Sequence, residues 1–144
     1  MSDVGQAVHA TAVVIGEDGI LIRGPAGAGK STLARELIRW AGERGRHCAL
    51  VSDDHVILER SHGRLIARAV PAIAGLLEIR GLGIVRAPWQ EAGLIGLVVD
   101  IREQAPRMPE EPNATATLRG IELPLIAVNQ ALALGVVVWH IGHR

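Results

Sequence analysis

The most informative run in the sequence is Gly24-Pro25-Ala26-Gly27-Ala28-Gly29-Lys30-Ser31. It has the pattern Gly-x-x-x-x-Gly-Lys-Ser of a phosphate-binding loop. Glycines let backbone N–H groups turn inward around phosphate oxygens, and the helix that follows adds the positive end of its dipole. In such loops the lysine contacts the β- and γ-phosphates, and the next hydroxyl binds Mg²⁺. We therefore expect these eight residues and Thr32 to bind the phosphates of a nucleotide, with Mg²⁺ at Ser31.

The segments around the loop predict the strand and the helix that this motif requires. Residues 8–15 and 20–23 are rich in β-branched and aliphatic side chains, which indicates a strand hairpin leading into the loop. Residues 30–41 repeat apolar side chains, such as Leu33 and Leu37, at helical spacing. A strand, the loop and a helix in this order form the context that supports a phosphate-binding role.

The rest of the chain predicts more strands than helices. The expected elements are a strand at 48–51, a hairpin within 56–67, a helical turn within 71–77, strands at 94–100 and 121–128 (the latter broken at Pro124) and a helix at 129–141. We therefore predict an α/β fold with a β-rich sheet and few helices. The length of 144 residues fits a single domain spanning 1–144.

The composition excludes several classes of protein. A hydrophobic fraction of 49% excludes disorder along the whole chain. Fifteen Lys and Arg balance fifteen Asp and Glu, whereas a protein that binds nucleic acid through its phosphates carries a basic excess. Cys48 is the only cysteine, which excludes an internal disulfide and indicates a cytoplasmic location. Residues 123–142 are apolar, but polar residues interrupt them, so a buried strand and helix are favoured over a membrane span.

An acidic pair, Asp53-Asp54, follows the strand expected at 48–51. In folds with a phosphate loop, the end of such a strand lies beside the nucleotide phosphates. One carboxylate could hold the metal while the other accepts the proton of an attacking hydroxyl. A solvated turn is the alternative interpretation of the pair, and the phosphate loop favours the catalytic one.

A second segment whose side chains could take part in catalysis is Glu78-Ile79-Arg80-Gly81-Leu82-Gly83-Ile84. Glu78 could complete a metal site, and Arg80 could neutralise a transferring phosphoryl group. The two glycines allow close approach of the backbone. A salt bridge at a strand edge followed by a bulge explains the same residues equally well, so both interpretations stay open on physical grounds.

Together these segments resemble the catalytic domain of the HPr kinase/phosphorylase family. The resemblance rests on His9, residues 24–31, the run Leu50-Val51-Ser52-Asp53-Asp54 and residues 78–84, in this order and spacing. It implies a phosphate-loop, β-rich fold related to phosphoenolpyruvate carboxykinase. It also implies ATP-dependent phosphorylation of a serine on HPr, the small phosphocarrier of the sugar phosphotransferase system. Many members of the family also reverse the reaction with inorganic phosphate and release pyrophosphate.

The resemblance assigns a role to each matching residue. Asp53 would be the catalytic acid/base, with His9 orienting it, and Arg107 would face the transferred phosphate. Lys30 and the loop amides would hold the phosphates of ATP. The remaining histidines, including His55, show no metal-ligand spacing and receive no role. The Mg²⁺ environment would be formed by Ser31, Asp54 and Glu78.

Departures from the family pattern shape the remaining expectations. The N-terminal domain of long relatives has no counterpart in this sequence, which therefore resembles a short form with the catalytic domain alone. Ala26 stands where relatives usually have a serine that could contact inorganic phosphate, so the phosphorylase direction stays open. We expect a homo-oligomer whose partner is an HPr-like carrier of the sugar or the nitrogen pathway.

Two other classes of function stay open. A small-metabolite kinase or NTPase would use the same loop, but such enzymes usually carry an arginine-bearing lid, and only residues 103–112 offer an extra loop. A non-catalytic nucleotide-gated binding module is the second class, and the intact Lys30, Ser31 and Asp53 disfavour it. ATP turnover without a protein partner would indicate the first class, and binding without turnover would indicate the second.

Overall fold

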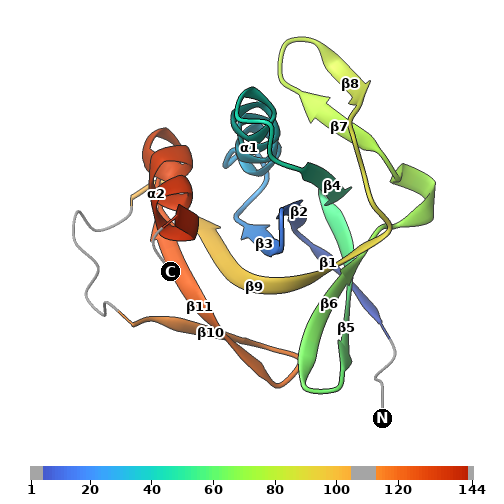
Figure 1. Ribbon diagram of the computed structural model, residues 1–144, viewed down its shortest axis with the longest axis vertical. Helices are drawn as coiled ribbons and strands as arrows, with labels where there is room; N and C mark the ends of the chain where they lie inside the picture. Colours follow the sequence, from blue (N-terminus) through green and yellow to red (C-terminus); the bar gives the residue numbers. More distant parts are fainter. Residues whose placement is uncertain (1–4, 105–112, 143–144) are drawn as a thin grey trace.

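The computed structural model of the protein describes residues 5–104 and 113–142. Within them, runs of aliphatic residues form strands, and two runs with helical spacing form helices (Figure 1). In chain order the elements are β1 (Gln6–His9), β2 (Thr11–Ile15), β3 (Asp18–Arg23), α1 (Lys30–Glu43), β4 (Cys48–Ser52), β5 (His55–Ser61), β6 (Arg64–Arg68), a 3₁₀ turn (Pro71–Ile73), β7 (Leu76–Ile79), β8 (Gly83–Arg86), β9 (Ala92–Ile101), β10 (Thr115–Leu118), β11 (Ile121–Val128) and α2 (Gln130–Gly142).

One large sheet organises the described residues. Its strands follow the order β1-β5-β6-β9-β3-β2-β4, with β11 also paired to β9 and β10 to β11. The strand β9 runs parallel to both β3 and β11, whereas the other pairs are antiparallel. The hairpin of β7 and β8 forms a separate small sheet that projects beside α1 (Figure 1). Three parallel strands therefore end at the same edge, where the glycine-rich loop leaves β3.

Apolar side chains cover both faces of the sheet around β3. Successive side chains on a strand point to opposite faces. Ile20 and Ile22 accordingly join the core beneath α1 and α2, while Leu21 joins a second cluster with Val56 and Leu58 from β5. Because β3 is buried on both faces, the loop that follows it leaves from a fixed strand end.

The strand expected at 8–15 is two strands that separate at Ala10. β1 pairs with β5, whereas β2 pairs with β3 and β4. This change of partner turns the chain from one part of the sheet into another. An apolar run does not record which strand its residues pair with, so the prediction of one continuous strand was wrong.

The break expected at Pro124 is also absent, because β11 continues through this residue. Residues 121–124 pair with β10, and residues 125–128 pair with β9. Pro124 is therefore the last residue of the ladder with β10 and precedes the ladder with β9, and prolines in sheets are tolerated where a ladder begins or ends. The sequence pattern also missed the short strands β7, β8 and β10, and β7 begins inside the segment that was expected to form a helical turn.

The predicted fold class is confirmed at the level of an α/β fold with a mostly β sheet and two helices in the described residues. The helical turn predicted within 71–77 is present as the 3₁₀ turn Pro71–Ile73. In the segments that the structure describes, neither helix is long and apolar enough to cross a membrane.

Candidate active site

The glycine-rich loop lies between β3 and α1, as the sequence predicts. Gly29 immediately precedes α1 with a φ of 107°, in the left-handed region that favours glycine. Lys30 is the first residue of the helix and is buried, and its Nζ donates to the carbonyls of Gly24 at 2.8 Å and Pro25 at 3.1 Å. These bonds fix the ammonium group inside the loop, where it faces the space that phosphates occupy in such motifs.

Asp53 is a buried carboxylate that joins three parts of the chain. Its Oδ1 accepts hydrogen bonds from Thr11 Oγ1 at 2.9 Å and Ser31 Oγ at 2.7 Å, and its Oδ2 accepts one from the backbone N–H of Glu78 at 3.1 Å. The residue is only 6% exposed. Asp53 thus holds β2, the first turn of α1 and β7 together around the loop.

Asp54 has a different environment, although it is the next residue. Its φ of 65° lies in the left-handed region, and its side chain is 57% exposed. Nε2 of His9 lies 2.7 Å from Oδ1, and Nδ1 of His55 lies 3.1 Å from Oδ2. The two histidines are opposite each other in the β1–β5 ladder. They hold the Asp54 carboxylate from two sides while leaving it accessible.

A cavity of about 300 Å³ brings the candidate side chains together. It is lined by residues of the loop and first helical turn, by Asp54 and by the β7–β8 hairpin; the lining residues are Ala26, Gly27, Gly29, Lys30, Ser31, Thr32, Asp54, Glu78 and Arg80. Arg80 also donates to the carbonyl of Gly27 at 3.3 Å. Two cationic and two anionic side chains therefore face one space.

The residues fit a bound Mg²⁺ ion. Mg²⁺ usually keeps several waters and takes one or two carboxylates together with substrate phosphates, rather than a cage made by the protein alone. Among the described residues no group of three or more His, Cys, Asp or Glu side chains could hold a metal ion by itself. The hydroxyl of Ser31 lies in the same cavity as the carboxylates of Asp54 and Glu78, and it bonds to Asp53.

The structure departs from the expected partner of His9. The expectation was that His9 orients Asp53, but its ring bonds to Asp54 instead. The left-handed backbone at Asp54 lets the two adjacent carboxylates engage different partners, since Asp53 bonds to Thr11 and Ser31. Arg107, the expected phosphate-facing arginine, falls within 105–112 and lies outside the described residues.

Sequence reasoning missed two contacts and left a third open. Thr11 donates to Asp53 and accepts from the backbone N–H of Asp54 at 3.1 Å. A single polar residue in an otherwise apolar strand was the sequence feature that could have indicated this buried hydrogen bond. His55 received no role, although it directly follows the acidic pair. For Arg80 the sequence left both a salt bridge and a phosphate contact open, and the structure instead shows it donating to the carbonyl of Gly27.

The fold and the site define a class of protein. It is an α/β domain in which a glycine-rich loop, the lysine of that loop and an aspartate of an acidic pair line one cavity. A family model described as the HPr Serine kinase C-terminal domain matches residues 3–89. The match covers more than half of the chain. The chain therefore belongs to the HPr serine kinase C-terminal domain family, which confirms the resemblance seen in the sequence.

Individual relatives agree with this assignment. An HPr kinase/phosphorylase of Clostridium tetani is 41% identical over 97 residues, which cover 66% of this chain and 28% of the relative. An HPr kinase/phosphorylase of Chlorobium phaeobacteroides is 33% identical over 135 residues, covering 85% of this chain and 38% of the relative. The chain thus spans well under half of these relatives.

The fold is also that of a solved structure. The Hpr(Ser) kinase/phosphatase from Coxiella burnetii superimposes with a TM-score of 0.78 at 29% sequence identity, and the match covers 96% of both chains. The likeness therefore extends beyond residues 3–89 to nearly the whole length of this chain.

Proposed function

We propose that this domain is an ATP- and Mg²⁺-dependent kinase that phosphorylates a serine of an HPr-like phosphocarrier. One observation carries the proposal: the histidine-held carboxylate of Asp54 faces the same cavity as Lys30 and Ser31. A phosphoryl acceptor that enters this cavity meets a base and a phosphate-binding loop together. The printed names of the relatives, HPr kinase/phosphorylase, support the carrier as the acceptor.

The loop and Lys30 hold the phosphates in this proposal. Lys30 exchanges its bonds to the Gly24 and Pro25 carbonyls for phosphate oxygens, which are stronger acceptors because they are charged. When bound, Mg²⁺ neutralises phosphate charge, with Ser31 as the protein's hydroxyl ligand. Asp53, which accepts a hydrogen bond from Ser31, would orient that hydroxyl towards a bound metal ion.

We further propose that Asp54, rather than Asp53, is the catalytic base. Asp53 is buried and accepts three hydrogen bonds, so an incoming serine has little access to it. Asp54 is exposed to the cavity and held by two histidines. As the serine oxygen forms its bond to the γ-phosphorus and the bond from phosphorus to the ADP oxygen breaks, Asp54 accepts the serine proton.

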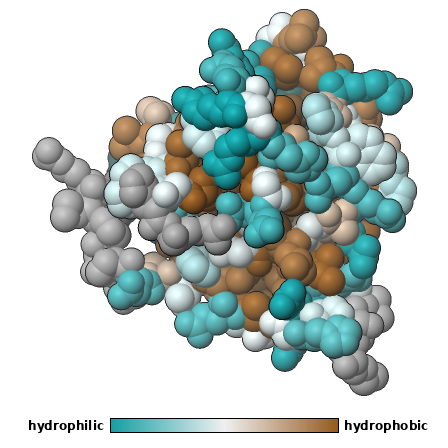
Figure 2. Space-filling view, viewed as in Figure 1, coloured by the Kyte–Doolittle hydropathy of each residue, from teal (hydrophilic) through white to brown (hydrophobic). Residues whose placement is uncertain are grey.

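The β7–β8 hairpin supports a protein as the acceptor. Arg80 of this hairpin contacts the loop and lines the cavity, where its charge can stabilise the transferring phosphoryl group, a role that we also keep for Arg107. The hairpin exposes Leu82 and Ile84, which are 72% and 64% accessible. A hydrophobic patch lies at the upper end of the molecule in Figure 2, where Figure 1 has this hairpin. A carrier can pack on this patch while its serine reaches Asp54.

We also propose a reverse reaction, a homo-oligomer, a cytoplasmic location and a relationship to phosphoenolpyruvate carboxykinase. The reverse reaction, in which inorganic phosphate takes the phosphoryl group from phosphoserine, would use the same cavity, where Ala26 offers a methyl group instead of a hydroxyl. The exposed Leu132, Val136 and Trp139 lie on one face of α2 and favour a homo-oligomer. A cytoplasmic location and the relationship to phosphoenolpyruvate carboxykinase also stay proposals.

A label-transfer assay tests the function. The protein is incubated with γ-labelled ATP, Mg²⁺ and purified HPr-type carriers, each beside its Ser→Ala variant. Label on the wild-type carrier alone is expected, and adding phosphate to that product then tests the reverse reaction. ATP turnover without a carrier would instead favour a small-metabolite kinase or NTPase. ATP binding without turnover would favour a nucleotide-gated binding module.

A further inference from the structure

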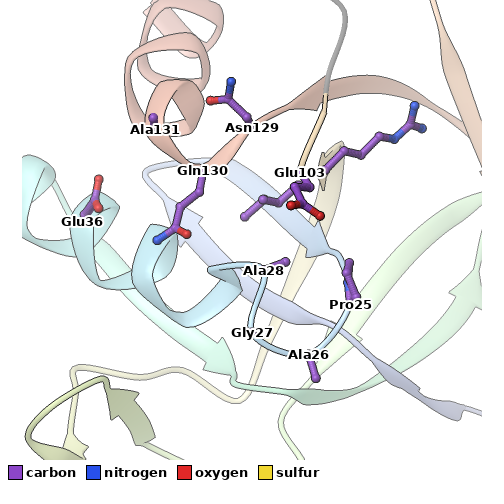
Figure 3. A pocket seen from close by; sticks show the side chains of 11 residues that line it. Pro25, Ala26, Gly27, Ala28, Glu36, Glu103, Asn129, Gln130 and Ala131 are labelled. Carbon is purple, nitrogen blue, oxygen red and sulfur yellow. The ribbon is translucent and has the colours of Figure 1, made fainter.

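A second and larger cavity lies on the other side of the glycine-rich loop. Its volume is about 820 Å³, and its lining includes Pro25 and Ala28 of the loop, Glu103 after β9, and Asn129 and Gln130 at the start of α2. Figure 3 shows the loop below this space, with the Gln130 and Glu103 side chains on either side of Ala28. None of the roles proposed above uses this cavity.

The sheet topology places this cavity and the acidic pair on opposite sides of β3. The cavity is built at the ends of β9 and β11, which run parallel to β3. In open sheets, ligands bind at the carboxyl ends of parallel strands. Asp53 and Asp54 follow β4, on the opposite side of β3 in the strand order. The loop thus stands between the carboxylates and this larger cavity.

The two cavities share part of the loop. Ala26 and Gly27 line both of them. A ligand with its phosphates on the loop and its reacting end towards Asp54 therefore has its other end at the larger cavity. That end of a nucleoside triphosphate is the ribose and the base.

The lining has the chemistry that a nucleoside needs. Ligand sites of this kind typically have volumes of about 300–1,000 Å³ and combine apolar surface with a few polar groups. The side-chain amides of Asn129 and Gln130 can pair with the edge of a base, as amides do with adenine. The carboxylate of Glu103 can accept hydrogen bonds from ribose hydroxyls, as acidic residues do in dinucleotide sites.

Contacts between α2 and the loop preorganise the lining. A Cβ atom at Gly29 would lie 2.6 Å from Cδ of Gln130, so the glutamine packs directly over the loop. The Oδ1 atom of Asn129 accepts a hydrogen bond from the backbone N–H of Leu132 at 3.0 Å and caps α2. Behind the lining, Asp100 of β9 forms an ion pair with Arg23 of β3 at 2.7 Å, which ties the ends of these strands together. Asp100 also pairs at 3.4 Å with Arg102, which lines the cavity.

From this arrangement we infer that the cavity formed by the loop, the end of β9 and the start of α2 binds the nucleoside half of the nucleoside triphosphate. The inference rests on the proposed function, because that function supplies the phosphates on the loop. It adds α2 to the nucleotide site and gives Glu103, Asn129 and Gln130 a part in recognising the ligand.

The test compares ATP with inorganic tripolyphosphate, which has the phosphates but no nucleoside. Affinities for both are measured by calorimetry with Mg²⁺ on the full chain. We expect the wild-type protein to bind ATP at least about tenfold more tightly than tripolyphosphate. Ala131→Trp, which fills the cavity from an exposed position on α2, should weaken ATP binding by about tenfold and leave tripolyphosphate binding unchanged.

Two further variants keep the test independent of folding defects. Leu132→Trp places the same ring on the neighbouring exposed residue, which does not line the cavity, and should bind ATP as the wild type does. Gln130→Ala should weaken ATP binding without adding bulk. Equal affinities of the wild type for ATP and tripolyphosphate, or an unchanged ATP affinity in both Ala131→Trp and Gln130→Ala, would overturn the inference while leaving the phosphate loop in place. Failure of both ligands to bind would overturn the proposed function itself, and the inference with it.

Discussion

Nε2 of His9 lies 2.7 Å from Oδ1 of Asp54, and this contact joins residues 45 positions apart in the chain. It connects the end of β1 to the turn after β4, beside the cavity that Lys30 and Ser31 line. The two acidic residues therefore differ: Asp54 has histidine partners and an exposed side chain, whereas Asp53 is buried and accepts three hydrogen bonds. The proposed chemistry follows from this difference.

The first prediction concerns His9. Replacing it with alanine removes a hydrogen bond to a carboxylate, a contact worth about 1.5–3 kcal/mol. We expect kcat for carrier phosphorylation to fall by roughly 10- to 150-fold, with the KM for ATP little changed because the loop is untouched. His9→Gln should restore part of the loss.

His62→Ala is the matched control for His9. His62 is exposed in the turn between β5 and β6 and contacts the hydroxyl of Ser61 at 2.9 Å. Its replacement should leave kcat unchanged. Steady-state kinetics that give the same kcat for His9→Ala and the wild type would contradict the positioning role.

The second prediction concerns the buried hydroxyl of Thr11. It donates to Asp53 and accepts from the backbone N–H of Asp54. Thr11→Val keeps the shape but leaves these groups unsatisfied, which costs about 1–3 kcal/mol of the free energy of unfolding. Urea denaturation measures this loss. Thr117→Val, at an exposed position of β10, should change stability by less than about 0.5 kcal/mol, and equal effects of the two changes would argue against the buried network.

The third prediction concerns Lys30. Lys30→Ala should weaken ATP binding by about tenfold or more and abolish transfer, because a buried ammonium group inside the loop is lost. Lys30→Arg should not restore transfer, since a planar guanidinium does not fit where a compact ammonium contacts two carbonyls. Calorimetry and the label-transfer assay give the two readouts. Transfer at the wild-type rate by Lys30→Ala would contradict the role of the loop.

The fourth prediction concerns pH and Cys48. Burial raises the pKa of this thiol from 9.0 to about 12, although nearby Arg46 acts in the opposite direction. Between these values the unfolded chain has lost a proton that the folded chain keeps. The contribution of the protonated thiol to the free energy of unfolding is therefore fully present below pH 9. It falls as the pH rises towards 12, by up to about 1.4 kcal/mol per pH unit.

Chemical denaturation at pH 8, 9 and 10 measures this slope. Cys48→Ala should remove the thiol's contribution and flatten the curve. A slope that is identical in Cys48→Ala and the wild type would show that other groups determine the alkaline instability.

Much of the local structure could be predicted from the sequence because its signals are short-range. The loop requires glycines and a lysine at fixed spacing, and α1 follows from the spacing of Leu33 and Leu37. The residues that meet in the cavity, Ser31, Asp54 and Glu78, were also predicted as a group, and the structure brings them together. Their roles in binding or catalysis stay predictions.

The pairing of individual groups could not be predicted. Asp53 and Asp54 are adjacent and chemically identical, and only the backbone turn at Asp54 determines which of them His9 meets. The change of partner at Ala10 depends on strands far away in the sequence, which a local pattern does not contain. The same holds for Gln130, which lies against Gly29 only because α2 returns to the loop.

The measurement that tests the central claim most directly is label transfer from γ-labelled ATP to an HPr-type carrier by the wild type, Asp54→Asn and Asp53→Asn side by side. We predict that the wild type labels the carrier but not its Ser→Ala variant. Asp54→Asn should bind ATP normally and transfer about 10²- to 10⁴-fold more slowly, whereas Asp53→Asn should mainly lose affinity for ATP with Mg²⁺. Transfer at the wild-type rate by Asp54→Asn, or equal labelling of the Ser→Ala carrier, would contradict the account.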